Sequence, residues 1–261
     1  MTIRNYGSFD GVFAHYIAAS RLGRVAKTYT VRGVNPSVTS PTPEDVWDAS
    51  SIYQYQDTAG VLSCVSTSAE DNPAGAGIGI IKILGLNGDW DMVEESVTLN
   101  GLTPVNTVNE YIRVLSVIGS KPGSADPNVT FAGQVKLERP GAILQATILA
   151  GGTTTNMSLF SIPRGYSGFL TQVWAASGTS DNYLLSQGIR EFGDIFIYGP
   201  DFPVEGLQFP TINLIPSSGY LPEKSDFKFV AKQNNVGSAA YVGYVVVLLK
   251  NDYLNSILES V

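Results

Sequence analysis

Residues 78–105 read IGIIKILGLNGDWDMVEESVTLNGLTPV, in which apolar segments are separated by turn signals. The segment 94–99 ends in alternating apolar and polar side chains, and this period of two is typical of a half-buried strand. Asn87-Gly88 and Asn100-Gly101 are dipeptides that favour hairpin turns with positive φ. The stretch therefore predicts antiparallel strands joined by tight turns.

Short segments of the same kind follow one another from residue 52 to residue 250. The segment 240–250 is apolar on both faces, which is typical of a central strand buried between layers. We expect an all-β fold: two antiparallel β-sandwich or jelly-roll-like domains with an N-terminal arm and a short C-terminal helix. Arg139-Pro140-Gly141 is the expected boundary, because Pro and Gly end one strand before another begins. The expected division is 1–49 for the arm and connector, 50–139 for the first β-sandwich domain, and 140–261 for the second, jelly-roll-like domain with its C-terminal helix.

The composition describes an acidic, sparsely charged chain. Its 261 residues carry a formal net charge of −7, with 44% hydrophobic and 15% charged residues. The single Cys excludes an internal disulfide framework, and the single His leaves little material for acid–base chemistry at neutral pH. No apolar run approaches the roughly 20 residues of a membrane helix. We expect a soluble, β-rich protein that is not an enzyme.

Groups that could carry catalysis are few, and each has a structural interpretation. His15 is the only imidazole, and the one carboxylate near it in the sequence is Asp10. Cys64 lies in the middle of an expected strand, where a buried, inert thiol is the usual state. Glu94 and Glu95 are adjacent in a strand, so they point to opposite faces and cannot flank one bond together. We therefore expect no catalytic residue, no cofactor and no metal.

The two ends of the chain differ from its body. In residues 1–49 every basic residue precedes position 33, and three of the four acidic residues follow position 43. The segment 10–21 has apolar residues at helical spacing, and the segment 251–261 combines a helix cap with a second apolar stripe. Both segments could bind partners, or could instead pack on the core of their own chain. The expected partner-binding residues are Arg4, Phe9, Phe13, Tyr16, Ile17, Arg21, Arg24, Leu254, Ile257 and Leu258.

Short segments spread over about residues 35–250 carry a family resemblance. They are Pro43-Glu44-Asp45-Val46-Trp47-Asp48, Ala59-Gly60-Val61-Leu62-Ser63, Ser68-Ala69-Glu70-Asp71, Gly75-Ala76-Gly77, Val97-Thr98-Leu99-Asn100-Gly101, Thr103-Pro104-Val105, Tyr111-Ile112-Arg113-Val114, Ile162-Pro163-Arg164-Gly165 and Pro222-Glu223-Lys224-Ser225-Asp226. In these segments the chain resembles a family of tailed-bacteriophage virion structural proteins that is widespread in aquatic phage genomes. The resemblance implies a virion structural protein without enzymatic activity. The loop Asp89-Trp90-Asp91-Met92 departs from the family pattern.

Two functional hypotheses follow. The first is a capsid decoration or cement protein on the virion surface, which binds the major capsid protein or other virion proteins and forms a homo-oligomer, most simply a trimer. The alternative is a fibre, tail or receptor-binding protein, in which Trp90 and Tyr220 would contact glycan. A carbohydrate-active enzyme is disfavoured, since no convincing carboxylate pair is present. Nucleic acid is not an expected partner, because the net charge of −7 repels phosphate. A membrane is not expected either.

Overall fold

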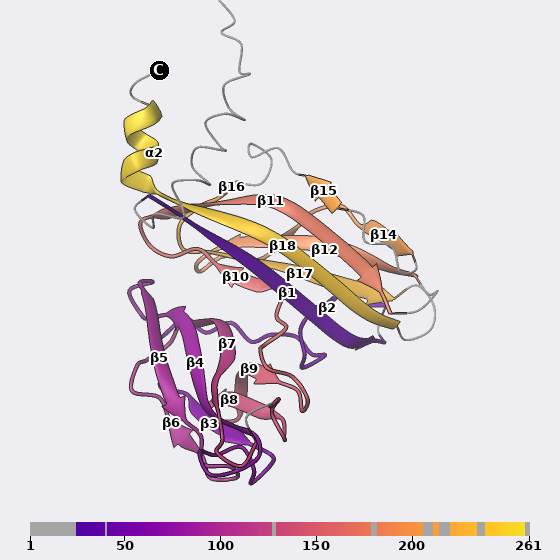
Figure 1. The fold of residues 1–261 in the computed structure, drawn as a ribbon. Coiled ribbons are helices and arrows are strands. Elements are labelled where there is room, and N and C mark those ends of the chain that lie inside the picture. Colours follow the sequence, from indigo (N-terminus) through magenta and orange to yellow (C-terminus); the bar gives the residue numbers. More distant parts are fainter. Residues whose placement is uncertain are drawn as a thin grey trace, which may run out of the picture.

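A computed structural model describes residues 25–39, 41–126, 129–178, 182–205, 211–213, 220–233 and 238–258. The described strands form four small antiparallel sheets, arranged as two bodies that meet along one side of the larger one (Figure 1). The expectation of an all-β, antiparallel fold is confirmed. The residues 1–24, and with them the expected arm helix, His15 and the sites Arg4, Phe9, Phe13, Tyr16, Ile17, Arg21 and Arg24, lie outside the described residues.

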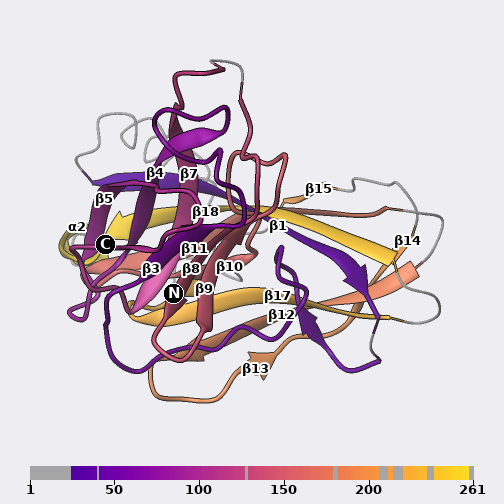
Figure 2. The same ribbon diagram turned by 90° about the horizontal axis from the view of Figure 1, so that it is seen from below.

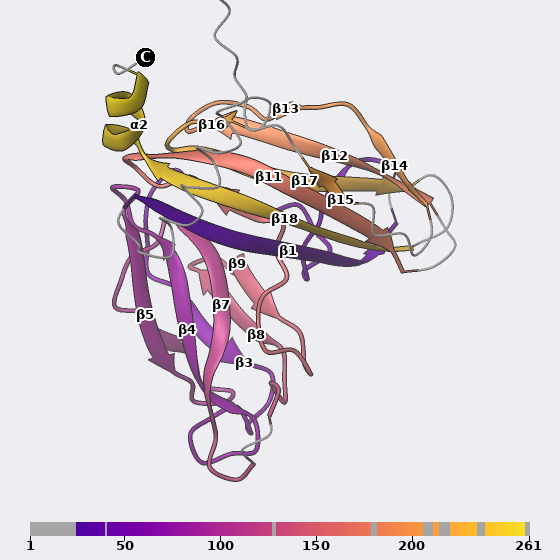
Figure 3. The same ribbon diagram turned by 45° about the horizontal axis from the view of Figure 1, so that its top comes forward.

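The larger body, here called the large sandwich, consists of sheets A and B lying face to face (Figure 3). Their rings meet in one core, as in the edge-to-face contact of Phe227 with Tyr244 at 5.2 Å between centroids. Sheet A has the order β1 (Ala26–Val38), β18 (Ser238–Lys250), β11 (Tyr166–Ser177) and β15 (Thr211–Asn213), with β16 (Tyr220–Leu221) also paired to β11. Sheet B has the order β10 (Leu159–Ser161), β17 (Ser225–Gln233), β12 (Asn182–Glu191) and β13 (Ile197–Tyr198); β14 (Phe202–Glu205) pairs with β12, and β2 (Glu44–Asp45) with β17.

The smaller body, here called the small sandwich, holds the other two sheets around a second core. Sheet C has the order β6 (Val105–Asn106), β3 (Ser63–Ser66), β8 (Val135–Arg139) and β9 (Ile143–Ile148). Sheet D has the order β5 (Met92–Thr98), β4 (Ile78–Leu86) and β7 (Arg113–Pro122). All strands of the small sandwich lie between β2 and β10 in the sequence, so this body is an insertion into the large sandwich (Figure 2).

The expected domain division is wrong at two places. Within the expected arm and connector, residues 26–38 and 44–45 are strands of the large sandwich, because β1 pairs with β18 along its length and β2 pairs with β17. The turn at Arg139-Pro140-Gly141 is not a boundary, since it joins β8 to β9 within sheet C. Pro and Gly mark a hairpin turn as readily as a domain end, and here Gly141 has φ 86° and Ala142 φ 59°. The expectation for 240–250 is confirmed, since β18 is central in sheet A and mostly buried.

The two Asn-Gly turns differ from the expected geometry. Gly101 has the expected positive φ, at 55°, whereas Asn100 does not. In the other turn the positive φ falls on Trp90, at 66°, and not on Gly88. The cause is the Asn87 side chain, whose Oδ1 accepts hydrogen bonds from the backbone N–H groups of Asp89 and Asp91, at 3.0 Å each. This wider loop replaces a two-residue turn.

We predict that Gly101→Val destabilises the protein by about 2 kcal/mol or more, because a β-branched residue is strained at positive φ. A Cβ on Gly101 would also lie 2.9 Å from the Cα of Ala69. The measurement is the thermal unfolding of both proteins. Gly88→Val is the matched control, since this glycine lacks positive φ and its Cβ would meet only Ala59 Cβ, at 3.3 Å. Equal effects of the two substitutions would contradict the assignment of strain to Gly101.

Candidate functional site

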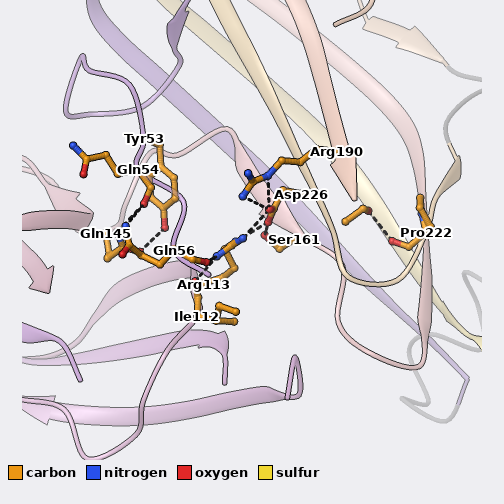
Figure 4. A network of polar contacts seen from close by, with 11 residues as sticks. Tyr53, Gln54, Gln56, Ile112, Arg113, Gln145, Ser161, Arg190, Pro222 and Asp226 are labelled. Atoms are coloured by element: carbon orange, nitrogen blue, oxygen red, sulfur yellow. Dashed lines mark hydrogen bonds and ion pairs between the residues drawn. The ribbon is translucent and has the colours of Figure 1, made fainter. Parts of the chain in front are cut away.

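The most elaborate arrangement of polar side chains lies where the two sandwiches meet. Arg113, at the start of β7 in the small sandwich, points its guanidinium at Asp226 in β17 of the large one (Figure 4). Nε donates to Asp226 Oδ1 at 2.7 Å and Nη2 donates to Oδ2 at 2.8 Å. Both side chains are buried, at 2% and 0% relative exposure. This two-pronged geometry orients the partners as well as attracting them.

Asp226 is the centre of the cluster, because it also accepts from the large sandwich. Arg190 in β12 donates from Nε to Oδ2 at 2.9 Å, and Ser161 in β10 donates from Oγ to Oδ1 at 2.6 Å. Nη1 of Arg113 donates to the backbone oxygens of Gln56 and Ile112. Burial disfavours the charge on Arg113, but the hydrogen bond and charge of Asp226 outweigh it and raise the pKa of Arg113 above its ordinary value.

Aromatic rings surround these cations. The Tyr55 ring has the Arg190 guanidinium 4.2 Å and the Arg113 guanidinium 5.0 Å from its centroid. The Trp90 ring also contacts Arg113, with 5.2 Å between the guanidinium and the ring centroid, and Trp90 is only 2% exposed. Beside them Lys228 forms a buried ion pair with Asp45, 2.6 Å between Nζ and Oδ1, under the ring of Phe196. The expectation that Trp90 contacts glycan is therefore wrong in this structure, because the ring is enclosed at the junction.

The charged groups of the junction form ion pairs with one another. The role of the junction in the fold is therefore to fix the small sandwich on the large one. Among the residues that the structure describes, no group of three or more His, Cys, Asp or Glu side chains is arranged to hold a metal ion. In the same part of the chain no helix is long and apolar enough to cross a membrane. Cys64 is buried, as expected, and burial raises the pKa of its thiol to about 12.

The two segments that connect the sandwiches also contact each other. Trp47, in the segment from β2 to β3, forms an antiparallel bridge with Met157, in the segment from β9 to β10. Next to it, the Asp48 carboxylate accepts from Asn156, through the backbone N–H at 3.0 Å and the side-chain amide at 3.2 Å. Burial raises the pKa of Asp48 to about 6, although the hydrogen bonds from Asn156 act in the opposite direction.

This raised pKa predicts a pH dependence. Between about pH 4 and pH 6 the folded chain holds a proton on Asp48 that the unfolded chain has lost, so the free energy of unfolding falls as the pH rises through this window. Asp48→Asn removes the titration. We expect the melting temperature of this variant, relative to wild type, to rise by a few degrees between pH 4.5 and pH 7, the shift that about 1 kcal/mol produces in a protein of this size.

Melting curves over that pH range test the prediction, with Asp57→Asn as the control because Asp57 is exposed. The difference between Asp48→Asn and wild type should change with pH by more than the difference for this control. Equal changes for the two variants would show that Asp48 does not titrate in this window.

Of the expected partner-binding residues, Leu254, Ile257 and Leu258 lie within the described part of the chain. Leu254, in α2 (Asn251–Leu258), is partly buried and packs on the cluster of Ala26, Val247 and Leu249 in its own sheet A. The start of the helix thus packs on the core of its own chain, which was the alternative to binding a partner. Ile257 and Leu258 belong to the same helix, but their side chains are outside the described residues. Asn251 fixes the first turn, since its Oδ1 accepts from Ser167 Oγ at 2.8 Å.

The junction residues Arg113, Arg190 and Asp226 were not anticipated as a site. A sequence signal did exist, because Arg113 and Asp226 are charged residues inside short apolar strand segments, and a charge buried in a strand needs a partner. Both lie in segments that carry the family resemblance. The pattern could not say which charge pairs with which, since the two are 113 positions apart.

No protein-family model matches the chain, and no curated protein sequence matches it significantly. Among solved structures it is similar to the infectious bursal disease virus Gx strain, with 11% identity and a TM-score of 0.27, over 87% of this chain and 72% of that one. The Gt strain gives 12% identity and a TM-score of 0.24, over 87% and 70%. The VP2 subviral particle of the same virus gives 12% and 0.20, over 87% and 73%. Likeness at this level carries no argument about function.

Proposed function

We propose that this chain is a virion structural protein of a tailed bacteriophage, and that it decorates the capsid surface as a cement protein. The observation that carries the proposal is the buried junction in which Arg113 of the small sandwich pairs with Asp226 of the large one and ties the two sandwiches together. A protein that braces a shell needs its contact points held in a fixed arrangement. The resemblance of several segments, including 111–114 and 222–226, to phage virion proteins supports the same assignment.

The strand order of the large sandwich supports this proposal. Sheet A contains β1, β18 and β11 followed by β15 or β16, and sheet B contains β10, β17 and β12 followed by β13 or β14. We interpret this as two Greek keys, the arrangement of a jelly roll, with the small sandwich inserted between β2 and β10. Jelly rolls serve as building units of viral shells and also as lectins.

The partners of the proposal are the major capsid protein or other virion proteins, and further copies of this chain, most simply in a trimer. The docking elements would be the N-terminal residues 1–24 and α2. Residues 1–24 hold three arginines and one aspartate, whereas the whole chain carries a net charge of −7. A basic segment on an acidic body can approach an acidic neighbour, and such association weakens as salt is added.

The test is the position and number of copies in particles of the virus that encodes the chain. We expect quantitative mass spectrometry to give a copy number that matches the shell lattice. Particles without the protein should lose DNA at a lower temperature while adsorbing normally to cells. A few copies per particle, or lost adsorption with unchanged heads, would instead support the fibre, tail or receptor-binding alternative. Tyr220 remains available to that alternative, since its side chain is 51% exposed.

A further inference from the structure

The ion pair of Lys228 with Asp45 is set by the pairing of two strands. Asp45 in β2 lies opposite Val230 in β17, and Lys228 is two residues along β17 from Val230, on the same face. Phe227 and Phe229 point the other way, into the core of the large sandwich. The strand ladder therefore holds the lysine and the aspartate next to each other on the face of sheet B that is turned away from this core.

Little water reaches this pair. The relative exposure is 5% for Lys228 and 1% for Asp45. The lysine Nζ lies 4.4 Å from the centroid of the Phe196 ring, and 5.8 and 5.9 Å from the centroids of Tyr55 and Tyr198. Burial removes the hydration that stabilises an ammonium and a carboxylate in water. Such surroundings favour a neutral product of the two groups over the pair of charges.

The contact between the two groups is close but is not aligned as a hydrogen bond. Lys228 Nζ is 2.6 Å from Asp45 Oδ1, yet this buried oxygen has no hydrogen-bond partner within the described part of the chain. The other carboxylate oxygen, Oδ2, accepts the backbone N–H of Tyr53 at 2.7 Å. One oxygen is therefore held by the backbone while the other faces the amine. An N–H donor at this distance stabilises a carbonyl oxygen when a nucleophile adds to its carbon.

We propose that Lys228 and Asp45 condense to an intramolecular amide, an isopeptide crosslink, once the chain has folded. Within the pair a proton passes from Nζ to Oδ1, and the neutral amine nitrogen then attacks Asp45 Cγ. The C–N bond forms, the bond from Cγ to Oδ1 breaks, and Oδ1 leaves as water with a second proton from Nζ. Oδ2 becomes the amide oxygen and keeps its hydrogen bond from Tyr53. The step needs no oxidant, cofactor or third reactant.

Position and burial together favour this condensation, although free amines and carboxylic acids do not condense in neutral water. Two reacting groups that are fixed in contact reach effective concentrations of about 10⁵–10⁸ M. The product also replaces two buried charges with one neutral amide. Lys232 and Asp201 provide the comparison in the same sheet, since they lie 2.5 Å apart but their side chains are 30% and 38% exposed. Water hydrates that pair, and we expect it to stay an ion pair.

The crosslink would join the strand at which the chain leaves the large sandwich to the strand that carries Asp226. β2 is the last strand of the large sandwich before the small one, and β17 holds both Lys228 and Asp226. Residues 45–228 would form a closed covalent loop that contains the whole small sandwich. Such a loop restricts the unfolded chain and so stabilises the folded one, as a disulfide does. The inference rests on this geometry and is independent of the proposed function.

Mass spectrometry of the full-length protein tests the proposal. We expect the denatured wild-type chain to have a mass lower than that of its sequence by one water molecule. Trypsin does not cut after an acylated lysine, so its digest should contain one branched peptide that joins residues 33–82 to residues 225–232. This peptide is the decisive result, because it is measured on the wild type and does not depend on whether a variant folds.

Two variants of β17 show which lysine reacts. Lys228→Arg keeps a cation but has no amine, so we expect the full sequence mass and two separate peptides. Lys232→Arg is the matched control at the exposed ion pair, and it should lose water as the wild type does. The proposal would be overturned by wild type with the full sequence mass, by a dehydrated chain that gives no branched peptide, or by a loss of water that persists in Lys228→Arg.

Discussion

Asp226→Ala is expected to lower the free energy of unfolding by about 3–5 kcal/mol, the cost of removing one partner from a buried ion pair. The substitution leaves the Arg113 and Arg190 guanidinium groups at the junction without their shared carboxylate. Arg113 is 2% exposed and cannot recover the lost interactions from water without opening the junction. The small sandwich should therefore loosen from the large one as well as losing stability.

Chemical denaturation measures the stability, and small-angle X-ray scattering measures the separation of the two sandwiches. The matched control is Glu94→Ala, which removes an equally close ion pair, 2.7 Å from Lys82, whose side chains are 40% and 51% exposed. An exposed pair contributes at most about 1 kcal/mol. If Asp226→Ala were no more destabilising than Glu94→Ala, the junction would not be what holds the sandwiches together.

The fold class could be predicted because it depends on local patterns. The alternation in 94–99 and the two apolar faces of 240–250 are set by neighbouring residues, and both segments are strands in the structure. The course of the chain between sheets depends on distant pairs instead. Ala26 pairs with Leu249, more than 200 positions away, and no local pattern encodes this choice. The small sandwich is inserted between β2 and β10, so β1 lies far from β18 in the sequence. For this reason the sequence suggested an arm where the structure has a strand.

The charged residues of the junction could likewise be predicted from the sequence only in part. The strand pattern places Arg113 on an apolar segment, and the structure buries it, but the partner comes from another body of the fold. Trp90 illustrates the reverse error. Its position in a loop with Asp89 and Asp91 favoured an exposed ring, yet the loop folds against Arg113 and encloses it. Exposure in a loop depends on what the loop packs against, which the sequence of the loop does not contain.

A second carboxylate organises the inside of the small sandwich. Asp71 follows β3 in the sequence and is fully buried. Its Oδ1 accepts the backbone N–H groups of Ile78 at 3.2 Å and Ala132 at 2.9 Å. Its Oδ2 accepts the hydroxyl of Ser66 and the N–H of Gly133, the latter at 2.9 Å. One side chain thus joins three separate segments of the chain, and each donor would be unpaired without it.

Asp71→Asn is expected to destabilise the protein by about 3 kcal/mol or more, although the side chain keeps its size. The amide puts an NH₂ group where one oxygen accepted two hydrogen bonds. At the Oδ1 position it faces the N–H groups of Ile78 and Ala132, and at the Oδ2 position it faces the N–H group of Gly133 and the Ser66 hydroxyl, which can turn to accept. At least one buried N–H group therefore loses its acceptor and faces another donor. Each buried group left unpaired costs about 1–3 kcal/mol. Thermal and urea unfolding measure the loss, and Asp89→Asn, at an exposed loop position, is the control with an expected change below about 0.5 kcal/mol. A small effect at Asp71 would mean that water reaches these donors, and the small sandwich would then owe its closure to its apolar core alone.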